Sequence, residues 1–135
     1  MKIMAVILAA GQGTRMRSEL PKVLHPLAGR PMIRYAIDTA KIVTGEKPVV
    51  VIGHGASAVQ EAVGEEALFA VQAEQLGTAH AVQSAEALLM GKADLVLVFY
   101  ADMPLLTVET MSKLVETQRK NPGPLTMLTV VLPDS

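Results

Sequence analysis

The sequence predicts an α/β fold in which a mostly parallel sheet is flanked by helices. Short apolar runs alternate with segments whose apolar residues recur at helical spacing, which is the rhythm of βα units. The run at 2–8 is apolar after its first residue, as in strands buried on both faces of a parallel sheet. With 135 residues, half of them hydrophobic, the chain can bury one core, so we expect one domain.

The expected elements follow from these patterns in chain order. We expect strands at 2–8, 48–52, 68–72 and 95–100, and a fifth strand, rich in Thr and Val, at 125–132. We expect helices at 32–43, 56–63 and 78–89, and a last helix whose apolar side contains Val108, Met111, Leu114 and Val115. Pro31 and Gly45 suit the two ends of the first helix, and Thr107 suits the cap of the last.

A glycine-rich loop follows the first expected strand, with the sequence Leu8-Ala9-Ala10-Gly11-Gln12-Gly13-Thr14-Arg15-Met16. In open α/β sheets ligands bind beyond the carboxyl ends of the strands, where this loop begins. Its small residues allow backbone N–H groups to approach phosphate oxygens or a base edge. Arg15 and Lys22 add the positive charge that a polyphosphate requires. The loop therefore predicts a nucleoside triphosphate site, although glycines that only permit a tight turn are the alternative.

The same loop does not match either of two common phosphate-binding signatures. It lacks the third glycine of G-x-G-x-x-G, and no Gly-Lys-Ser/Thr follows it as in a P-loop. A dehydrogenase and an ordinary ATPase are therefore disfavoured.

Polar residues follow two further strands at the same expected edge. Asp102 comes after the strand at 95–100 and can bind Mg²⁺, which takes one or two carboxylates together with substrate phosphates. Alternatively, Asp102 caps the turn before Pro104. Gln72 offers donors and an acceptor, which suits a base such as uracil, and Gly77 and Thr78 permit close approach and hydrogen bonding. The alternative for Gln72 to Thr78 is an ordinary strand end and helix start.

Composition excludes several classes of protein. The absence of cysteine excludes disulfides and thiolate zinc sites, and a net charge of −1 without a basic run argues against nucleic acid as a partner. The N-terminal apolar run is too short to span a bilayer and has no signal-peptide cleavage pattern, so we expect a cytoplasmic protein without a membrane partner. His25, His54 and His80 lack the spacing of a metal site and are expected to be structural.

Residues 8–15 together with Leu20-Pro21-Lys22-Val23-Leu24 resemble the signature of the sugar-nucleotide pyrophosphorylases. The segments 22–32, 72–81 and 100–105 are similar, more narrowly, to the nucleotidyltransferase domain of the N-acetylglucosamine-1-phosphate uridyltransferase family, in the family's order over nearly the whole chain. The resemblance implies a Rossmann-like nucleotide-diphospho-sugar transferase fold. It also implies uridylyl transfer from UTP to N-acetylglucosamine 1-phosphate with Mg²⁺, giving pyrophosphate and the UDP-N-acetylglucosamine used for peptidoglycan and lipopolysaccharide of the cell wall.

The resemblance also implies a set of site residues. Arg15 and Lys22 would be catalytic, and Asp102 would bind the metal. The substrate-binding residues would be Leu8, Ala9, Ala10, Gly11, Gly13, Thr14, Lys22, Gln72, Gln75, Gly77, Thr78, Tyr100, Ala101 and Asp102. The family usually has Gly in place of Ala101, where an added methyl group narrows the approach of ribose or phosphate unless the local φ is negative.

The family's domain continues through a Gly-Tyr-Gly segment and later Glu and Asn residues that have no counterpart here. We therefore expect residues 1–135 to be the nucleotide-binding half of the domain, with its C-terminal portion missing and with weak or no turnover. Two alternatives remain open: another NTP-sugar, cytidylyl or guanylyl transferase, and a non-catalytic nucleotide-binding module that self-assembles. If the C-terminal portion of the domain is missing, the apolar surface that it would cover is exposed. Such a surface favours a homo-oligomer.

Overall fold

A computed structural model describes residues 1–10, 20–53, 56–121 and 123–128 of the chain. Within them, four strands form one parallel sheet of order β5-β4-β1-β6. These strands are β1 (Ile3–Leu8), β4 (Val49–Ile52), β5 (Leu68–Val71) and β6 (Leu95–Tyr100). The α/β class and the first four predicted strands are therefore confirmed.

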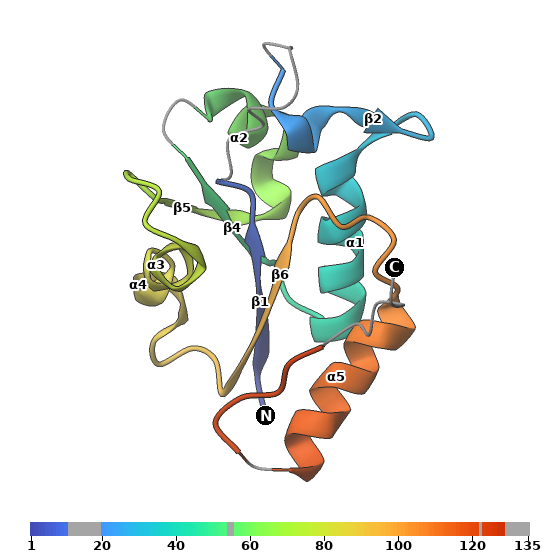
Figure 1. The fold of residues 1–135 in the computed structure, drawn as a ribbon, viewed down its shortest axis with the longest axis vertical. Helices are drawn as coiled ribbons and strands as arrows, with labels where there is room; N and C mark the ends of the chain where they lie inside the picture. The colour runs from blue at the N-terminus through green and yellow to red at the C-terminus, as the bar shows by residue number, and fades with distance from the viewer. Residues whose placement is uncertain (11–19, 54–55, 122, 129–135) are drawn as a thin grey trace, which may run out of the picture.

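Helices cover both faces of this sheet, and the central strand β1 is buried along its whole length (Figure 1). The odd-numbered residues of β1 pack in a core with α1 (Met32–Thr44), α2 (Ser57–Val63) and α5 (Val108–Lys120). Its even-numbered residues pack in a second core with α3 (Thr78–Gln83) and α4 (Glu86–Leu89). Figure 1 shows α1 and α5 on one side of the sheet and α3 and α4 on the other. The fold thus has three layers, as the resemblance implied.

The predicted helix ends agree closely with the structure. Gly45 ends α1, and its N–H donates to Lys41 O at 2.8 Å. Thr107 caps α5, because its hydroxyl oxygen accepts a hydrogen bond from the Thr110 N–H at 3.1 Å. Met111 and Val115 of α5 are buried against the sheet, with Leu114 partly buried beside them.

The prediction of one helix over 78–89 is wrong, because the segment divides into α3 and α4. The Ser84 hydroxyl donates to His80 O at 3.0 Å, in competition with the backbone N–H of Ser84 for the same carbonyl. Bonds of this kind bend helices. The next bonds join Ala85 N–H to Val82 O and Leu88 N–H to Ala85 O, which is the tighter 3₁₀ spacing.

The prediction of a fifth strand at 125–132 is wrong for its described part. Residues 125–128 have no strand conformation, and Leu125 and Met127 are about 70% exposed (72% and 69%). The reason is local, since the Thr126 hydroxyl donates to Gln118 Oε1 and Gln118 Nε2 donates to Gly123 O at 2.6 Å. These bonds fold the chain back on the end of α5 rather than into the sheet. Residues 129–132 lie outside the described residues.

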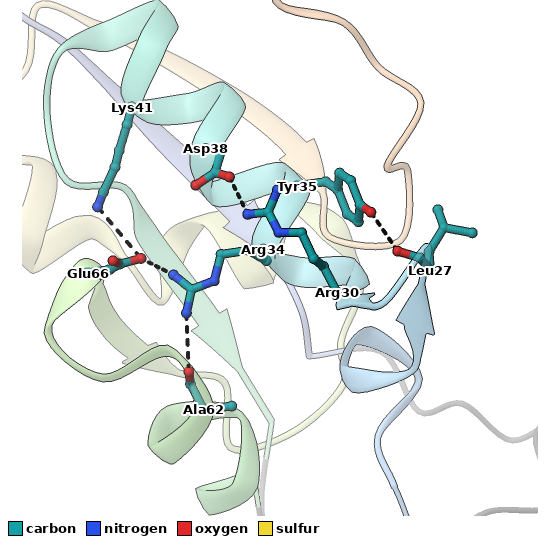
Figure 2. A network of polar contacts seen from close by, with 8 residues as sticks. All are labelled: Leu27, Arg30, Arg34, Tyr35, Asp38, Lys41, Ala62 and Glu66. Atoms are coloured by element: carbon teal, nitrogen blue, oxygen red, sulfur yellow. Dashed lines mark hydrogen bonds and ion pairs between the residues drawn. The ribbon is translucent and has the colours of Figure 1, made fainter.

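A small hairpin that the sequence did not predict leads into α1. The 3₁₀ turn η1 (Lys22–Leu24) is followed by β2 (Pro26–Leu27) and β3 (Arg30–Pro31), which pair antiparallel. The Tyr35 hydroxyl donates to Leu27 O at 2.5 Å, and Arg30 donates to Asp38 Oδ2 at 2.5 Å. Figure 2 shows both contacts. The hydrogen bond to Asp38 raises the pKa of the Arg30 guanidinium above its ordinary value. Side chains of α1 thus attach the hairpin to the body of the fold.

A second group of polar contacts attaches α1 to the segment after α2. Arg34 is paired with Glu66 of the 3₁₀ turn η2 (Gly64–Glu66), and its other nitrogen donates to Ala62 O at 3.4 Å (Figure 2). Lys41 Nζ lies 3.7 Å from the same Glu66 carboxylate. These groups are at least partly exposed, so their contribution to stability is modest. None of the helices in the described ranges is long and apolar enough to cross a membrane.

Candidate functional site

The predicted site residues converge because the parallel strands end at one edge. Leu8 is in register with Val51 of β4 and with Tyr100 of β6, so the segments after β1 and β6 leave the sheet together. The Ala101 N–H donates to Leu8 O at 3.0 Å, and the Ala9 N–H donates to Val51 O at 2.9 Å. The Gln72 N–H continues this pattern with Ile52 O at 2.8 Å. The carboxyl edge of the sheet is therefore the floor of the candidate site.

Lys22 and Asp102, which are 80 positions apart, form an ion pair at this edge. Lys22 Nζ donates to Asp102 Oδ2 at 3.1 Å, with the two side chains 44% and 37% exposed. Lys22 begins η1, and its neighbours Val23 and Leu24 are buried in the core. That anchor fixes the backbone of Lys22 while its long side chain stays accessible to a ligand. The structure thus brings together one predicted catalytic cation and the predicted metal ligand.

The Asp102 carboxylate is suited to a divalent cation. Asp102 Oδ2 already accepts a hydrogen bond from the Lys22 ammonium group, and the carboxylate is accessible to solvent. Among the described residues, no three His, Cys, Asp or Glu side chains are grouped to bind a metal ion. A cation on Asp102 would therefore take its other ligands from bound phosphates or water, which is the usual arrangement for Mg²⁺.

The loop between β5 and α3 reaches over to the end of β1. Gln75 donates from Nε2 to Ala10 O, the last described residue before the glycine loop. The same carbonyl lies against Gly53, where an added Cβ would come within 3.1 Å of Ala10 O. A side chain at 53 would press on this carbonyl. The role of Gly53 was not predicted, although its place directly after a strand is a signal for it.

Gln72 is buried, with 3% exposure, and its side-chain amide is bonded within the protein. Nε2 lies 3.3 Å from Gly77 O and 3.0 Å from His80 Nδ1. Gly77 has φ 102°, a conformation that favours glycine and directs its carbonyl toward Gln72. His80 was expected to be structural, and its contact with the buried Gln72 amide is one that the sequence did not predict.

Thr78 and Tyr100 join α3 to the end of β6. Their hydroxyl oxygens are 2.8 Å apart, and both residues are exposed at the carboxyl edge. The predicted contact residues of two loops are therefore linked by a direct hydrogen bond, with hydroxyl groups at the surface that a ligand could use.

Ala101, the departure from the family pattern, is accommodated without strain. It is fully buried, and its methyl group packs in the core shared with α1 and α5. Among the described residues, Ala28 is the one non-glycine residue with positive φ, so the backbone of Ala101 suits alanine. The condition under which alanine is harmless at this position, a φ that is not positive, is therefore met.

The structure describes the first three residues of the predicted glycine-loop contact set. Leu8, Ala9 and Ala10 lie at the carboxyl edge as predicted, and all three are buried. The predictions for Gly11, Gly13, Thr14 and Arg15 fall outside the described residues.

Comparisons of sequence identify the relatives of this chain. Residues 5–131 match the family described as MobA-like NTP transferase domain. The chain is 48% identical over 134 residues to Bifunctional protein GlmU of Brevibacillus brevis, and 55% identical over 130 residues to that of Burkholderia lata. These alignments cover 99% and 96% of this chain but 29% and 28% of the relatives. The chain therefore spans less than a third of the length of these relatives.

Solved structures show the same architecture. Rv0371c from Mycobacterium tuberculosis H37Rv has a TM-score of 0.75 and 23% identity, over 88% of this chain and 61% of that protein. A second structure of it, in complex with manganese, has a TM-score of 0.72 at 22% identity, over 89% of this chain and 61% of that one. Both likenesses show the fold alone.

A CMP:2-keto-3-deoxy-manno-octonic acid synthetase complexed with CTP has a TM-score of 0.70 and 26% identity, over 90% of this chain and 49% of that one. The family match extends over almost all of the strands, helices and edge residues described above. The chain therefore belongs to the family of MobA-like NTP transferase domains, and it is a nucleotidyltransferase by family.

Proposed function

We propose that this chain is the nucleotide-binding half of a uridylyltransferase that joins UTP and N-acetylglucosamine 1-phosphate, with Mg²⁺ as the divalent cation. The observation that carries the proposal is the Lys22–Asp102 pair at 3.1 Å, at the sheet edge where the buried amide of Gln72 also lies. A cationic and an anionic side chain at one edge are the groups that a nucleoside triphosphate and its metal require. The similarity to GlmU relatives supports the same choice.

In this proposal the base and the phosphates contact different loops. Gln72, Gly77, Thr78 and Tyr100 face the uridine, while Lys22 binds phosphate oxygens. When bound, the divalent cation neutralises phosphate charge that would otherwise repel the second substrate. When the nucleotide and the cation bind, the ion pair between Lys22 and Asp102 breaks. Lys22 then contacts the phosphates, and Asp102 contacts the cation.

The reaction needs no protein nucleophile. An oxygen of the sugar 1-phosphate forms a bond to the α-phosphorus of UTP, the bond to the bridging oxygen breaks, and pyrophosphate leaves with that oxygen. The protein positions the two phosphates and stabilises the developing charge through Lys22 and Arg15. Because the chain spans less than a third of the GlmU relatives, we propose that its own turnover is weak or absent.

Calorimetric titration tests this function directly. UTP, CTP and GTP are titrated into the 135-residue chain with and without Mg²⁺. We expect UTP to bind most tightly and its affinity to rise with Mg²⁺. Equal affinity for the three nucleotides, or tighter binding of CTP, would contradict uridylyl specificity. Absence of binding by every triphosphate would contradict the nucleotide site itself.

A further inference from the structure

The buried amide of Gln72 has an orientation that the surrounding chemistry determines. A carbonyl oxygen can only accept hydrogen bonds, so the Gln72 atom that faces Gly77 O at 3.3 Å must be the NH₂ nitrogen. The second hydrogen of that NH₂ group then points to His80 Nδ1 at 3.0 Å.

The same bond fixes the state of the His80 ring. Because the Gln72 NH₂ group donates, His80 Nδ1 must accept, so the neutral ring has its proton on Nε2. His80 is half-buried on α3, and its carbonyl accepts hydrogen bonds from the N–H and the hydroxyl of Ser84. The backbone of His80 is therefore held in place, and its ring is held in one tautomer.

The remaining atom of the amide, Gln72 Oε1, is directed away from both partners. No hydrogen bond to Oε1 occurs within the described part of the chain, and no buried side-chain polar atom there lacks a partner. Gln72 as a whole is 3% exposed, so the orientation of its amide is set by these two bonds within the described part of the chain. Gln72 Oε1 is thus a hydrogen-bond acceptor held in one orientation, on the side of the amide opposite to Gly77 O and His80 Nδ1.

We infer that His80 is a positioning residue that determines base specificity by holding the Gln72 amide with Oε1 outward. This inference rests on the proposed function, in which Gln72 faces the base. Uracil presents an N3–H donor to such an acceptor, whereas cytosine presents an unprotonated N3 at the same place, and two acceptors repel each other. If the amide could rotate, its NH₂ group would suit cytosine equally well. Discrimination between the two pyrimidines therefore depends on the two bonds that hold the amide, to Gly77 O and to His80 Nδ1, and the bond to His80 is the one that a side-chain substitution can remove.

The binding test compares two substitutions that differ in whether they can accept a hydrogen bond. His80→Phe keeps a flat ring without an acceptor, and His80→Asn offers an amide oxygen near the position of Nδ1. The ratio of CTP to UTP dissociation constants is measured by calorimetry for each. We expect His80→Phe to lower this ratio about tenfold or more, and His80→Asn to preserve most of it. Thermal melts of both variants establish that they are folded.

A double substitution separates positioning from a general structural effect. In a Gln72→Leu background the ratio is already low, so adding His80→Phe should not change it further. A merely structural role for His80 would instead weaken both nucleotides equally and leave the ratio unchanged. An unchanged ratio in His80→Phe overturns the inference, as does a His80→Asn variant that discriminates as poorly as His80→Phe.

A spectroscopic measurement decides the orientation without any nucleotide. Long-range ¹H–¹⁵N correlation spectra of the wild-type chain report which ring nitrogen of His80 is protonated. We expect an unprotonated Nδ1, and a proton on Nδ1 would overturn the inference. If Nδ1 is unprotonated but the wild-type chain does not prefer UTP, the proposed uridylyl function fails while the positioning of Gln72 by His80 stands.

Discussion

Asp102 is the residue on which a metal requirement would depend most directly. Asp102→Asn keeps the size of the side chain but removes the charge that pairs with Lys22. We expect the variant to lose the Mg²⁺-dependent part of UTP affinity, because a neutral amide binds Mg²⁺ poorly. Calorimetry with and without Mg²⁺ measures this loss. Stability should change by less than about 1 kcal/mol, since the pair is partly exposed.

Asp38→Asn is the matched control for Asp102→Asn. Asp38 also pairs with a cation, Arg30, and is 44% exposed, but it lies on α1 among the contacts of Figure 2 rather than at the candidate site. Its substitution should leave UTP affinity and the Mg²⁺ effect unchanged. Equal behaviour of the two variants would contradict the role of Asp102.

Substitution of Lys22 should change the affinity for UTP and the affinity for Mg²⁺ in opposite directions. In Lys22→Ala the phosphates lose a charged donor, so we expect UTP affinity to fall about tenfold or more. Asp102 loses its competing ammonium group, so Mg²⁺ alone should bind more tightly. Titrations of UTP and of Mg²⁺ measure the two effects, with Lys92→Ala, at the opposite end of the sheet, as the control. A fall in both affinities would show that Lys22 does not compete for Asp102.

Single residues were predictable where their chemistry follows from position after a strand. Lys22 and Asp102 follow a glycine-rich loop and a buried strand, so the sequence already assigned both to one edge. Their direct pairing was not predicted, because it joins residues 80 positions apart. The contact between His80 and the buried amide of Gln72 was not predicted for a related reason, since helical periodicity says nothing about such a partner.

Among the helices and strands, the buried strands were the easiest to predict from the sequence. Features that depend on local hydrogen bonds were the hardest to predict. The four sheet strands are nearly continuous apolar runs, which depend little on context. The break between α3 and α4 falls at Ser84 and Ala85 within an alanine-rich segment, where the hydrogen bonds change locally to 3₁₀ spacing. The hairpin of β2 and β3 has two-residue strands and two prolines, which pattern analysis does not detect.

The cap of α5 gives a test at this scale. Thr107→Ala removes the acceptor of the Thr110 N–H, which should destabilise the chain by about 1 kcal/mol and lower Tm by about 4 °C. Thr117→Ala is the matched control, because Thr117 lies in the same helix but its hydroxyl donates to Lys113 O rather than capping an end. Thermal unfolding followed by circular dichroism compares them. Equal melting temperatures for the two variants would contradict the capping role.

For the whole molecule, the two faces of the sheet are covered unequally. The helices α3 and α4 pack on β1, β4 and β5, but β6 leaves Val96, Val98 and Tyr100 exposed on that face at 38%, 36% and 44%. A row of exposed apolar side chains is typical of a surface that binds another protein surface. The fold class could be predicted from periodicity, whereas this gap could not, because it depends on how far α3 and α4 extend across the sheet.

We expect this face of β6 to mediate association between copies of the chain. Val98→Lys places a charge at the centre of the exposed row, and burying that charge in a contact between two apolar faces is costly. Sedimentation velocity over a range of concentrations should show the wild-type chain associating reversibly and Val98→Lys remaining monomeric. Ile42→Lys, at a position 67% exposed on α1 in the opposite layer, should associate like the wild type. A wild-type chain that stays monomeric at every concentration would contradict the expectation, and dissociation by Ile42→Lys would place the contact on another surface.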